Sequence, residues 1–256
     1  PPRGITPRAL SVSLYGDSKR LEEILRLFGR ILSRAERRGI GRPDFSALER
    51  SFPDTLIAGK INIRFESRPP LVNAGGYILG LPLTTVLKIR GITPFQHDTS
   101  RPDPGTGEKP RVLTIENKET FYALAEDPQT LPGFTCFLYT AGHPNGAVRA
   151  LVSILAASGF SFFHAGDPDP EGILILQELA EIAGKPVIPI RMDGPAFDRY
   201  AHCGRKLEPT MLSRISLINE ATLRLPGIKE LIKKIQETGL GIEQEIIDYR
   251  FSTPDL

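Results

Sequence analysis

Three carboxylates stand where short apolar segments end, and their spacing suits a metal-assisted reaction. Glu116 directly follows the apolar run at residues 112–115, and Asp167 and Asp169 follow the run at 160–163 after a three-residue turn. If both runs are parallel strands, these acids lie at one edge of a single sheet. Carboxylates this close repel one another unless a cation lies between them, and hard oxygen ligands suit Mg²⁺ or Mn²⁺. Such an ion polarises a phosphate and activates water, so we predict Glu116, Asp167 and Asp169 as catalytic metal ligands.

Four further acids are candidates for the same site. Glu119 lies three residues after Glu116 and shares its face if this segment is helical, so we add it to the catalytic group. Glu171 is a candidate metal ligand, with ordinary first-turn helix chemistry as an equal alternative. Glu243 and Glu245 would supply another ligand if a final helix folds back on the site, and otherwise they form an exposed helix face. Asp167 itself has the alternative role of capping the helix that follows it.

A glycine-bearing turn at residues 141–146 follows a predicted strand and precedes a predicted helix. Gly142 and Gly146 would let backbone N–H groups approach a phosphate, and Lys118 is a further candidate phosphate contact. The turn lacks the endings of nucleotide and dinucleotide loops, so an ordinary strand-to-helix turn is the alternative. His143 and His164 are candidates for a general base, and the sequence does not choose between them.

Charge is distributed unevenly along the chain. Residues 1–50 have a net charge of +5 and residues 111–195 have a net charge of −5, although the whole chain has only +2. Apolar spacing predicts an amphipathic helix over residues 18–38, with basic residues on its polar side. A ridge that contacts DNA phosphates and a merely solvated face are the two interpretations. The first interpretation assigns phosphate binding to Lys19, Arg20, Arg26, Arg30, Arg34 and Arg38.

The predicted elements that must position these residues follow a regular order. Short strands at residues 112–115, 136–139, 160–163 and 187–190 alternate with helices at 118–125, 147–157 and 172–183, which indicates βαβ units and a parallel sheet. A strand is predicted at 55–65, a Pro- and Gly-rich loop at 97–110, and helices at 211–221, 228–235 and 242–249. We therefore predict three domains: 1–105, 110–205 and 206–256.

Composition limits the class of protein. The chain has 256 residues, of which 40% are apolar and 24% charged, so it can bury a core and is not a disordered or fibrous chain. Its two cysteines cannot form a disulfide framework or a zinc site by themselves, which favours the cytoplasm. We find no signal peptide and no run of about 20 apolar residues, so no membrane association is expected. Because the chain begins at Pro1 without a methionine, we expect further sequence upstream.

Two resemblances join these observations. An acid after the first strand, a glycine-bearing turn after the second and the sequence DPDPEG at residues 167–172 after the third resemble the Toprim domain of topoisomerases, primases and related nucleases. The sequences LYGDSKRLE at residues 14–22 and TIENKETF at 114–121 resemble the JetD-like nuclease subunits of Wadjet anti-plasmid systems. The Toprim resemblance covers about residues 110–205, and the second covers most of the chain.

The resemblance implies a fold and an activity. The implied fold is α/β: a Toprim domain with a parallel-sheet βαβ core, preceded by a winged-helix-like or mixed α+β DNA-binding region and followed by C-terminal helices. JetD-like proteins are similar to the A subunit of topoisomerase VI and are usually dimers. They act with a condensin-like SMC complex that extrudes plasmid DNA. The implied activity is hydrolysis of phosphodiester bonds in circular double-stranded DNA by an endonuclease that depends on Mg²⁺ or Mn²⁺.

Other functions stay open at this point. Topoisomerase-like cleavage needs a tyrosine nucleophile, and neither Tyr15 nor Tyr77, the only upstream tyrosines, lies in a matching motif. A non-catalytic DNA-binding or assembly subunit could use the same Toprim scaffold. A phosphatase or a sugar-nucleotide transferase could also use an Asp-x-Asp metal site. However, haloacid-dehalogenase phosphatases have Thr or Val at the position of Glu171, and a transferase would not need the basic helix.

Overall fold

The computed structural model describes residues 55–66, 69–95 and 109–249, together with Leu14, Tyr15, Arg20 and Ile24. The chain forms two compact units, residues 1–53 and residues 54–256. In the first unit the four described residues are helical, and the side chain of Arg20 is exposed. The other basic residues predicted to bind phosphate there lie outside the described residues. So does most of the part before residue 55 of the winged-helix-like region that we predicted over residues 1–105.

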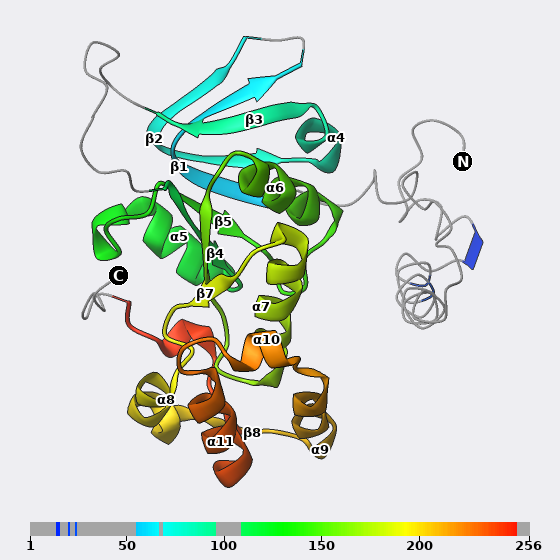
Figure 1. Cartoon of the computed structure of the whole chain (residues 1–256), viewed down its shortest axis with the longest axis vertical. Helices are drawn as coiled ribbons and strands as arrows, with labels where there is room; N and C mark the ends of the chain where they lie inside the picture. The colour runs from blue at the N-terminus through cyan, green and yellow to red at the C-terminus, as the bar shows by residue number, and fades with distance from the viewer. Residues whose placement is uncertain are drawn as a thin grey trace. The chain divides into compact units, whose positions relative to one another are not determined.

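The second unit combines one large sheet with helices (Figure 1). Its strands are β1 (Thr55–Phe65), β2 (Leu71–Leu81), β3 (Ile89–Pro94), β4 (Arg111–Ile115), β5 (Cys136–Tyr139), β6 (Ser161–Ala165), β7 (Val187–Pro189), β8 (Arg205–Lys206) and β9 (Leu240–Gly241). Its α-helices are α4 (Leu83–Val86), α5 (Lys118–Glu126), α6 (Gly146–Ala157), α7 (Pro170–Ala183), α8 (Gly194–Tyr200), α9 (Pro209–Leu212), α10 (Glu220–Leu223) and α11 (Ile228–Thr238). Short 3₁₀ helices are η1 (Pro128–Thr130), η2 (Ala201–Cys203), η3 (Ser213–Leu217) and η4 (Gln244–Ile246). None of the helices in the described ranges has the length and apolar character needed to cross a membrane.

The large sheet has seven strands in the order β2-β1-β5-β4-β6-β7, with β3 also paired to β1. Strands β5, β4, β6 and β7 are parallel, as predicted, and β1 is antiparallel to its three partners. Strands β4, β5 and β6 are short and almost wholly buried, which explains why their sequences are continuous apolar runs rather than alternating ones. The mixed α/β class predicted from the sequence is therefore confirmed.

Each helix of the parallel part begins at a side chain that caps it. Asn117 accepts from the N–H of Thr120 at the start of α5, and Asn145 accepts from Ala147 and Val148 at the start of α6. Helices α6 and α7 pack against each other, and α5 packs on β4 and β5 and touches η4. Fully buried aromatic side chains fill the core between the sheet and its helices: Phe121, Phe137, Phe160, Phe162 and Phe197.

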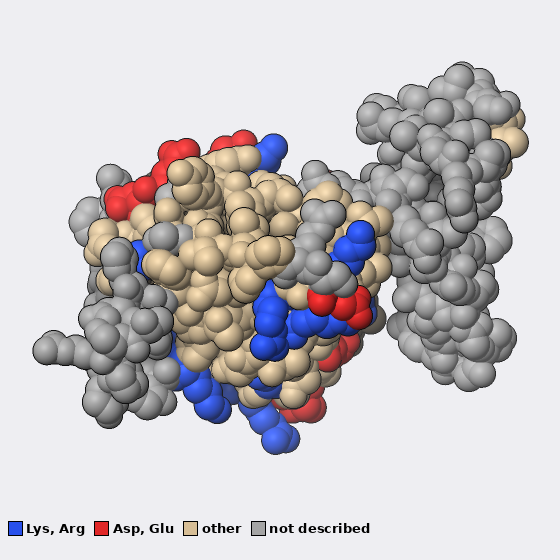
Figure 2. Space-filling model, turned by 90° about the horizontal axis from the view of Figure 1, so that it is seen from above, with Lys and Arg blue, Asp and Glu red and all other residues tan. Residues whose placement is uncertain are grey.

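The sheet runs across the domain boundary that we predicted between residues 105 and 110. Residues 56–59 of β1 pair with β5, and residues 61–65 continue past the amino end of β5 and pair with β3. Strands β1 to β3 therefore belong to the same compact unit as the parallel strands. Figure 2 looks onto this end of the unit, where lysine and arginine side chains gather within a mostly uncharged surface. Whether residues 1–105 act together in DNA binding stays a prediction.

The C-terminal tail contains less helix than we predicted. The segment 211–221 is divided into α9, η3 and the start of α10, because Asn219 caps a new helix there. The predicted final helix at 242–249 is wrong, since only the single 3₁₀ turn η4 forms within it. Its backbone donors are used elsewhere: Ile242 N–H donates to Pro168 O at 3.3 Å and Gln244 N–H donates to Asp167 Oδ1 at 2.7 Å. Both N–H groups would lack a partner in the first turn of a helix that began at residue 242, and these long-range hydrogen bonds instead attach the segment to the loop after β6.

Candidate active site

The candidate site lies where the order of the parallel strands reverses. From β4 the chain moves to β5 on one side, and then crosses to β6 on the other side of β4. The loops that leave β4 and β6 diverge at this point, which opens a crevice outside the carboxyl ends of the strands. Glu116 follows β4 and Asp167 follows β6 by two residues, so both acids lie at this crevice. The Asp167 N–H donates to Glu116 Oε2 at 3.3 Å.

Asp169 is held by contacts on both of its carboxylate oxygens. Its Oδ1 accepts from the N–H groups of Glu171 and Gly172 and so caps α7. Its Oδ2 forms an ion pair with Arg205 at 3.0 Å, and only 1% of the residue is exposed. The same arginine forms a second ion pair with Glu243. Asp169 is thus a helix cap and an ion-pair partner in this structure, beside the other acids of the site.

His164 and Glu116 converge on Gly166. A methyl group on Gly166 would come within 2.6 Å of His164 Nε2 and 2.9 Å of Glu116 Oε2, so glycine is required there. Thr114 Oγ1 donates to Phe163 O and lies 2.9 Å from His164 Nδ1, which assigns the ring proton to Nδ1. The Nε2 atom is then a buried acceptor, and it has no hydrogen-bond partner among the described residues.

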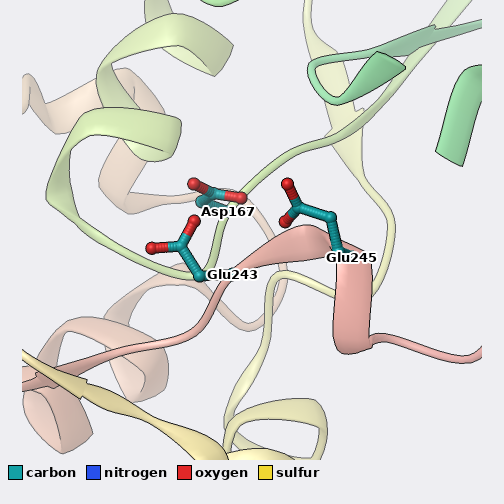
Figure 3. Close-up of side chains that lie close together, drawn as sticks. All are labelled: Asp167, Glu243 and Glu245. Carbon is teal, nitrogen blue, oxygen red and sulfur yellow. The ribbon is translucent and has the colours of Figure 1, made fainter. Parts of the chain in front are cut away.

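Two acids from the C-terminal tail complete the cluster. Asp167, Glu243 and Glu245 each place one carboxylate oxygen within 4.8 Å of the others. Figure 3 shows the three side chains lying close together. Glu243 is the N-cap of η4 and Glu245 lies within this turn, which contacts the loop after β6. Glu245 also accepts a hydrogen bond from the side-chain amide of Asn117, directly after Glu116. Glu243 and Glu245 thus reach the site through a folded-back extended segment, and not through the helix that we predicted.

The electrostatics of the site reflect uncompensated negative charge. Burial, and after it the neighbouring Asp167 carboxylate, together raise the pKa of Glu116 to about 8. Burial likewise raises the pKa of Asp167 to about 7, with added repulsion from Asp169, Glu243 and Glu245, while the Gln244 N–H lowers it. The pKa of Asp169 is raised by burial too, although its contacts with Gly172 and Arg205 oppose the shift.

These raised pKa values predict that binding of a divalent cation strengthens as pH rises from 6 to 9. Below pH 7 Glu116 and Asp167 hold protons that a cation must displace, so we expect affinity to rise up to about tenfold per pH unit for each displaced proton. Calorimetric titration with Mg²⁺ at four pH values tests this, and an affinity that does not change with pH would contradict it. Without a cation, the raised pKa values also make the stability of the fold depend on pH. The contribution of the two protonated acids is fully present below their pKa values in the unfolded chain, near 4, and it is lost as pH rises through 7 to 8.

A separate charged network holds the turn after β5 against α7. His143 lies 2.6 Å from Glu171 Oε1 and 2.7 Å from Glu178 Oε2. Its hydrogen bonds to Glu178 and Glu171 raise the pKa of His143 to about 9 despite partial burial, so the ring is charged at neutral pH and is not a base. Arg214 also donates to Glu171 Oε1 at 2.9 Å. The carboxylate of Glu171 therefore has two cationic partners, His143 and Arg214, and these balance its charge without a metal.

The remaining predicted residues lie around the cluster. Glu119 is exposed in the first turn of α5 and lines a cavity of about 360 Å³ that Glu245 also lines. Lys118 is exposed, with Nζ 5.9 Å from the centre of the Tyr122 ring. Gly142 has a left-handed backbone, with φ of 83°, and Gly146 begins α6. The N–H groups of residues 147 and 148, just after Gly146, already donate to Asn145, so two donors of the predicted phosphate turn are occupied.

Three residues at the site were missed by the analysis of the sequence. Arg205 lies 36 residues from Asp169, and nothing in its local sequence distinguishes it. Asn117 and Gln244 are direct neighbours of candidate acids, in the sequences IEN at 115–117 and IEQE at 242–245. Their side chains are neutral, so neither was considered as a ligand or a catalytic group. The Asn117 N–H donates to Gln244 Oε1 at 2.8 Å across 127 residues of chain. Only the fold brings these residues together.

The fold and the site define the class: an α/β protein whose parallel sheet carries a cluster of carboxylates suited to a divalent cation at its switch point. Comparison with protein-family models then identifies the family. Residues 74–256 match the family described as Wadjet protein JetD, C-terminal, and the chain belongs to this family. The match begins within β2 and includes β3, so it too crosses the boundary predicted near residue 105. No curated protein matches the chain.

Proposed function

We propose that this chain is a metal-dependent DNA endonuclease of a Wadjet defence system that hydrolyses phosphodiester bonds in double-stranded DNA. The observation that carries the proposal is the meeting of Asp167, Glu243 and Glu245 beside Glu116 at the switch point of the sheet. Membership of the JetD family supports the defence role. The nuclease activity rests on the chemistry of the acids and on the Toprim resemblance.

The donor set fits Mg²⁺ or Mn²⁺. All of its ligand atoms are carboxylate oxygens, which these hard cations prefer. Mutual repulsion contributes to the raised pKa values of Glu116 and Asp167, so a divalent cation would compensate charge that the chain leaves unbalanced. We propose that Glu116, Asp167, Glu243 and Glu245 hold the cation, with Asp169 beside them. A cation bound there would polarise a phosphate oxygen and lower the pKa of a bound water.

Arg205 is suited to bind the phosphate itself. Its guanidinium contacts Asp169 and Glu243 at the edge of the cluster, and 45% of its side chain is exposed. Guanidinium groups bind phosphate oxygens through two parallel hydrogen bonds. Arg205 therefore offers a positive charge beside the carboxylates where the negative charge of a phosphodiester would gather during hydrolysis.

The wider assignments follow from the resemblance. The order of acids and turns on β4, β5 and β6 supports a Toprim domain at residues 110–205, and with it a relation to the A subunit of topoisomerase VI. We propose the basic residues of the first 50 as contacts to DNA phosphates. We also propose circular plasmid DNA as substrate, a condensin-like SMC complex as partner, a second copy of the chain as dimer partner, and the cytoplasm as location.

One observation favours a second candidate function, a non-catalytic subunit that uses the same scaffold. Both oxygens of Asp169 are occupied by the α7 cap and by Arg205, as in a purely structural acid. In this alternative the chain binds DNA or assembles with partners, and it needs no metal.

Cleavage of supercoiled plasmid separates the two candidates. We expect the chain to nick or linearise the plasmid with Mg²⁺ or Mn²⁺ and not with a chelator, and we expect Glu116→Gln to lose this activity. Glu126→Gln is the matched control, because Glu126 is an exposed acid in the last turn of α5. If the wild-type chain neither cleaves DNA nor binds Mg²⁺ or Mn²⁺ by calorimetry with DNA present, the scaffold function replaces the nuclease function.

A further inference from the structure

The C-terminal segment 240–249, here called the strap, contacts both loops that carry the acids, the loop after β4 and the loop after β6. It begins with β9, which pairs with β8, and continues past the loop after β6 through η4. The side chains of Ile242, Gln244, Ile247 and Tyr249 are buried, whereas Glu245 is exposed. The strap is thus anchored by its buried residues while it presents Glu243 and Glu245 at the site.

Gln244 is the residue through which the strap contacts both loops. It is fully buried, with no exposed area, and it is polar. Its backbone N–H donates to Asp167 Oδ1 at 2.7 Å, and its side-chain Oε1 accepts from the Asn117 N–H at 2.8 Å. Its Nε2 donates to Tyr249 Oη at 3.1 Å, so both polar atoms of the side-chain amide have a partner. One residue therefore joins the loop after β4, the loop after β6 and the end of the strap.

These contacts determine the spacing of the carboxylates. Asn117 follows Glu116 directly, so the Gln244 side chain sets the position of the β4 loop relative to Asp167. Because Asp167 Oδ1 accepts the Gln244 N–H, the carboxylate of Asp167 is held in one orientation. Glu243 and Glu245 are the chain neighbours of Gln244, so anchoring Gln244 also places both of them. Magnesium demands near-ideal geometry, and partners that orient its ligands commonly contribute ten- to a hundredfold in affinity.

We infer that Gln244 is a positioning residue of the cation site, and that its side-chain amide holds the ligands from β4, β6 and the strap at their binding distances. This inference rests on the proposed function, because it assumes that the clustered acids bind a divalent cation. Gln244 contributes no charge and is not itself proposed as a ligand. Its contribution is the Asn117 to Gln244 hydrogen bond.

The test compares the affinity of the full chain for Mn²⁺, measured by calorimetry, in matched variants. Gln244→Met keeps the length of the side chain and removes the acceptor, so affinity is expected to fall at least tenfold. Gln244→Glu keeps an acceptor for Asn117 and can accept from the Tyr249 hydroxyl, and its added negative charge attracts the cation, so its affinity is expected to be no lower than about one third of the wild-type value. Gln177→Met is the control, because Gln177 Oε1 also accepts a backbone N–H, that of Asn219, at 2.8 Å and away from the acids.

Two further variants separate the Asn117 contact from the general stability of the strap. If Gln244→Met does not fold, Gln244→Asn withdraws the acceptor with a polar side chain, and the same loss is expected. Tyr249→Phe removes the hydroxyl but leaves the Asn117 contact, so its unfolding temperature is expected to fall while its affinity for Mn²⁺ is retained. Unchanged affinity in Gln244→Met, or an equal loss in Tyr249→Phe, would overturn the positioning role while leaving the nuclease proposal intact. A wild-type chain that binds no Mn²⁺ would overturn both.

Discussion

Replacing Asp167 by asparagine is expected to abolish metal-dependent cleavage of plasmid DNA, with a loss of at least about 100-fold in rate. Asp167 is the acid that joins the two parts of the site: its N–H contacts Glu116, and its carboxylate lies with Glu243 and Glu245. Asparagine keeps the size of the side chain and an oxygen that accepts the Gln244 N–H, so the local fold should survive. The substitution removes one negative charge from a cluster whose repulsion already raises the pKa of Asp167.

Although Asp167→Asn is expected to lose cleavage, it is not expected to lose stability. Because the ionised Asp167 carboxylate is destabilising in the metal-free chain above pH 7, Asp167→Asn should unfold at an equal or higher temperature at pH 8. Thermal unfolding with and without Mg²⁺ measures both effects, since the stabilisation by Mg²⁺ should also be lost. Asp127→Asn is the control, because Asp127 is an exposed acid whose side chain accepts from the Thr130 hydroxyl. Cleavage at the wild-type rate by Asp167→Asn would place the catalytic site elsewhere.

The second large effect is expected from Gly172→Ala, in the first turn of α7. A methyl group on Gly172 would lie 2.2 Å from the carbonyl oxygen of Asp167 and 3.0 Å from its nitrogen. Both are backbone atoms, so no side-chain rotation relieves the clash and the loop itself must move. We expect the free energy of unfolding to fall by about 1–3 kcal/mol, the usual cost of overpacking. We also expect cleavage to be lost, because the displaced peptide carries Asp167.

Denaturant unfolding and plasmid cleavage measure these two effects on the same preparation. Gly80→Ala on β2 is the control, because a methyl group there meets only the Leu56 side chain at an ordinary 3.8 Å. A Gly172→Ala chain that unfolds at the wild-type denaturant concentration and cleaves normally would mean that the loop accommodates the methyl group without moving Asp167. In that case the close contact between α7 and the loop after β6 would not determine the position of Asp167.

The neighbourhood of the site also shows how one acidic motif serves different purposes. In the sequence DPDPEG, Asp167 faces the other acids, Asp169 caps α7 and pairs with Arg205, and Glu171 pairs with His143 and Arg214. Their chemical type is the same, but their partners differ because the chain turns sharply between β6 and α7. This difference is why we propose Glu116, Asp167, Glu243 and Glu245 as the cation ligands, with Asp169 and Glu171 in supporting positions.

The parallel core could be predicted because its signals are local. Strands buried on both faces are continuous apolar runs, and the helices between them carry periodic apolar residues and asparagine caps. The positions of Glu116 and Asp167 after neighbouring strands followed from that pattern alone. Strand β1 was also predicted, and it has the observed bounds 55–65. Its antiparallel pairing with β2, β3 and β5 was not predicted, because register between distant segments is not encoded in the local sequence.

The sequence by itself determined the alternation of strands and helices and the placing of Glu116, Asp167 and Asp169 at the ends of strands. The tertiary structure decided which of these acids meet, and which residues join them. The segment 242–249 has apolar spacing that suits a helix, yet its backbone donates to Pro168 and Asp167, more than 70 residues away. Arg205 and Gln244 became part of the site in the same way. Local spacing governs hydrogen bonds within an element, whereas contacts between distant segments depend on burial and on donors that only the packed chain brings together.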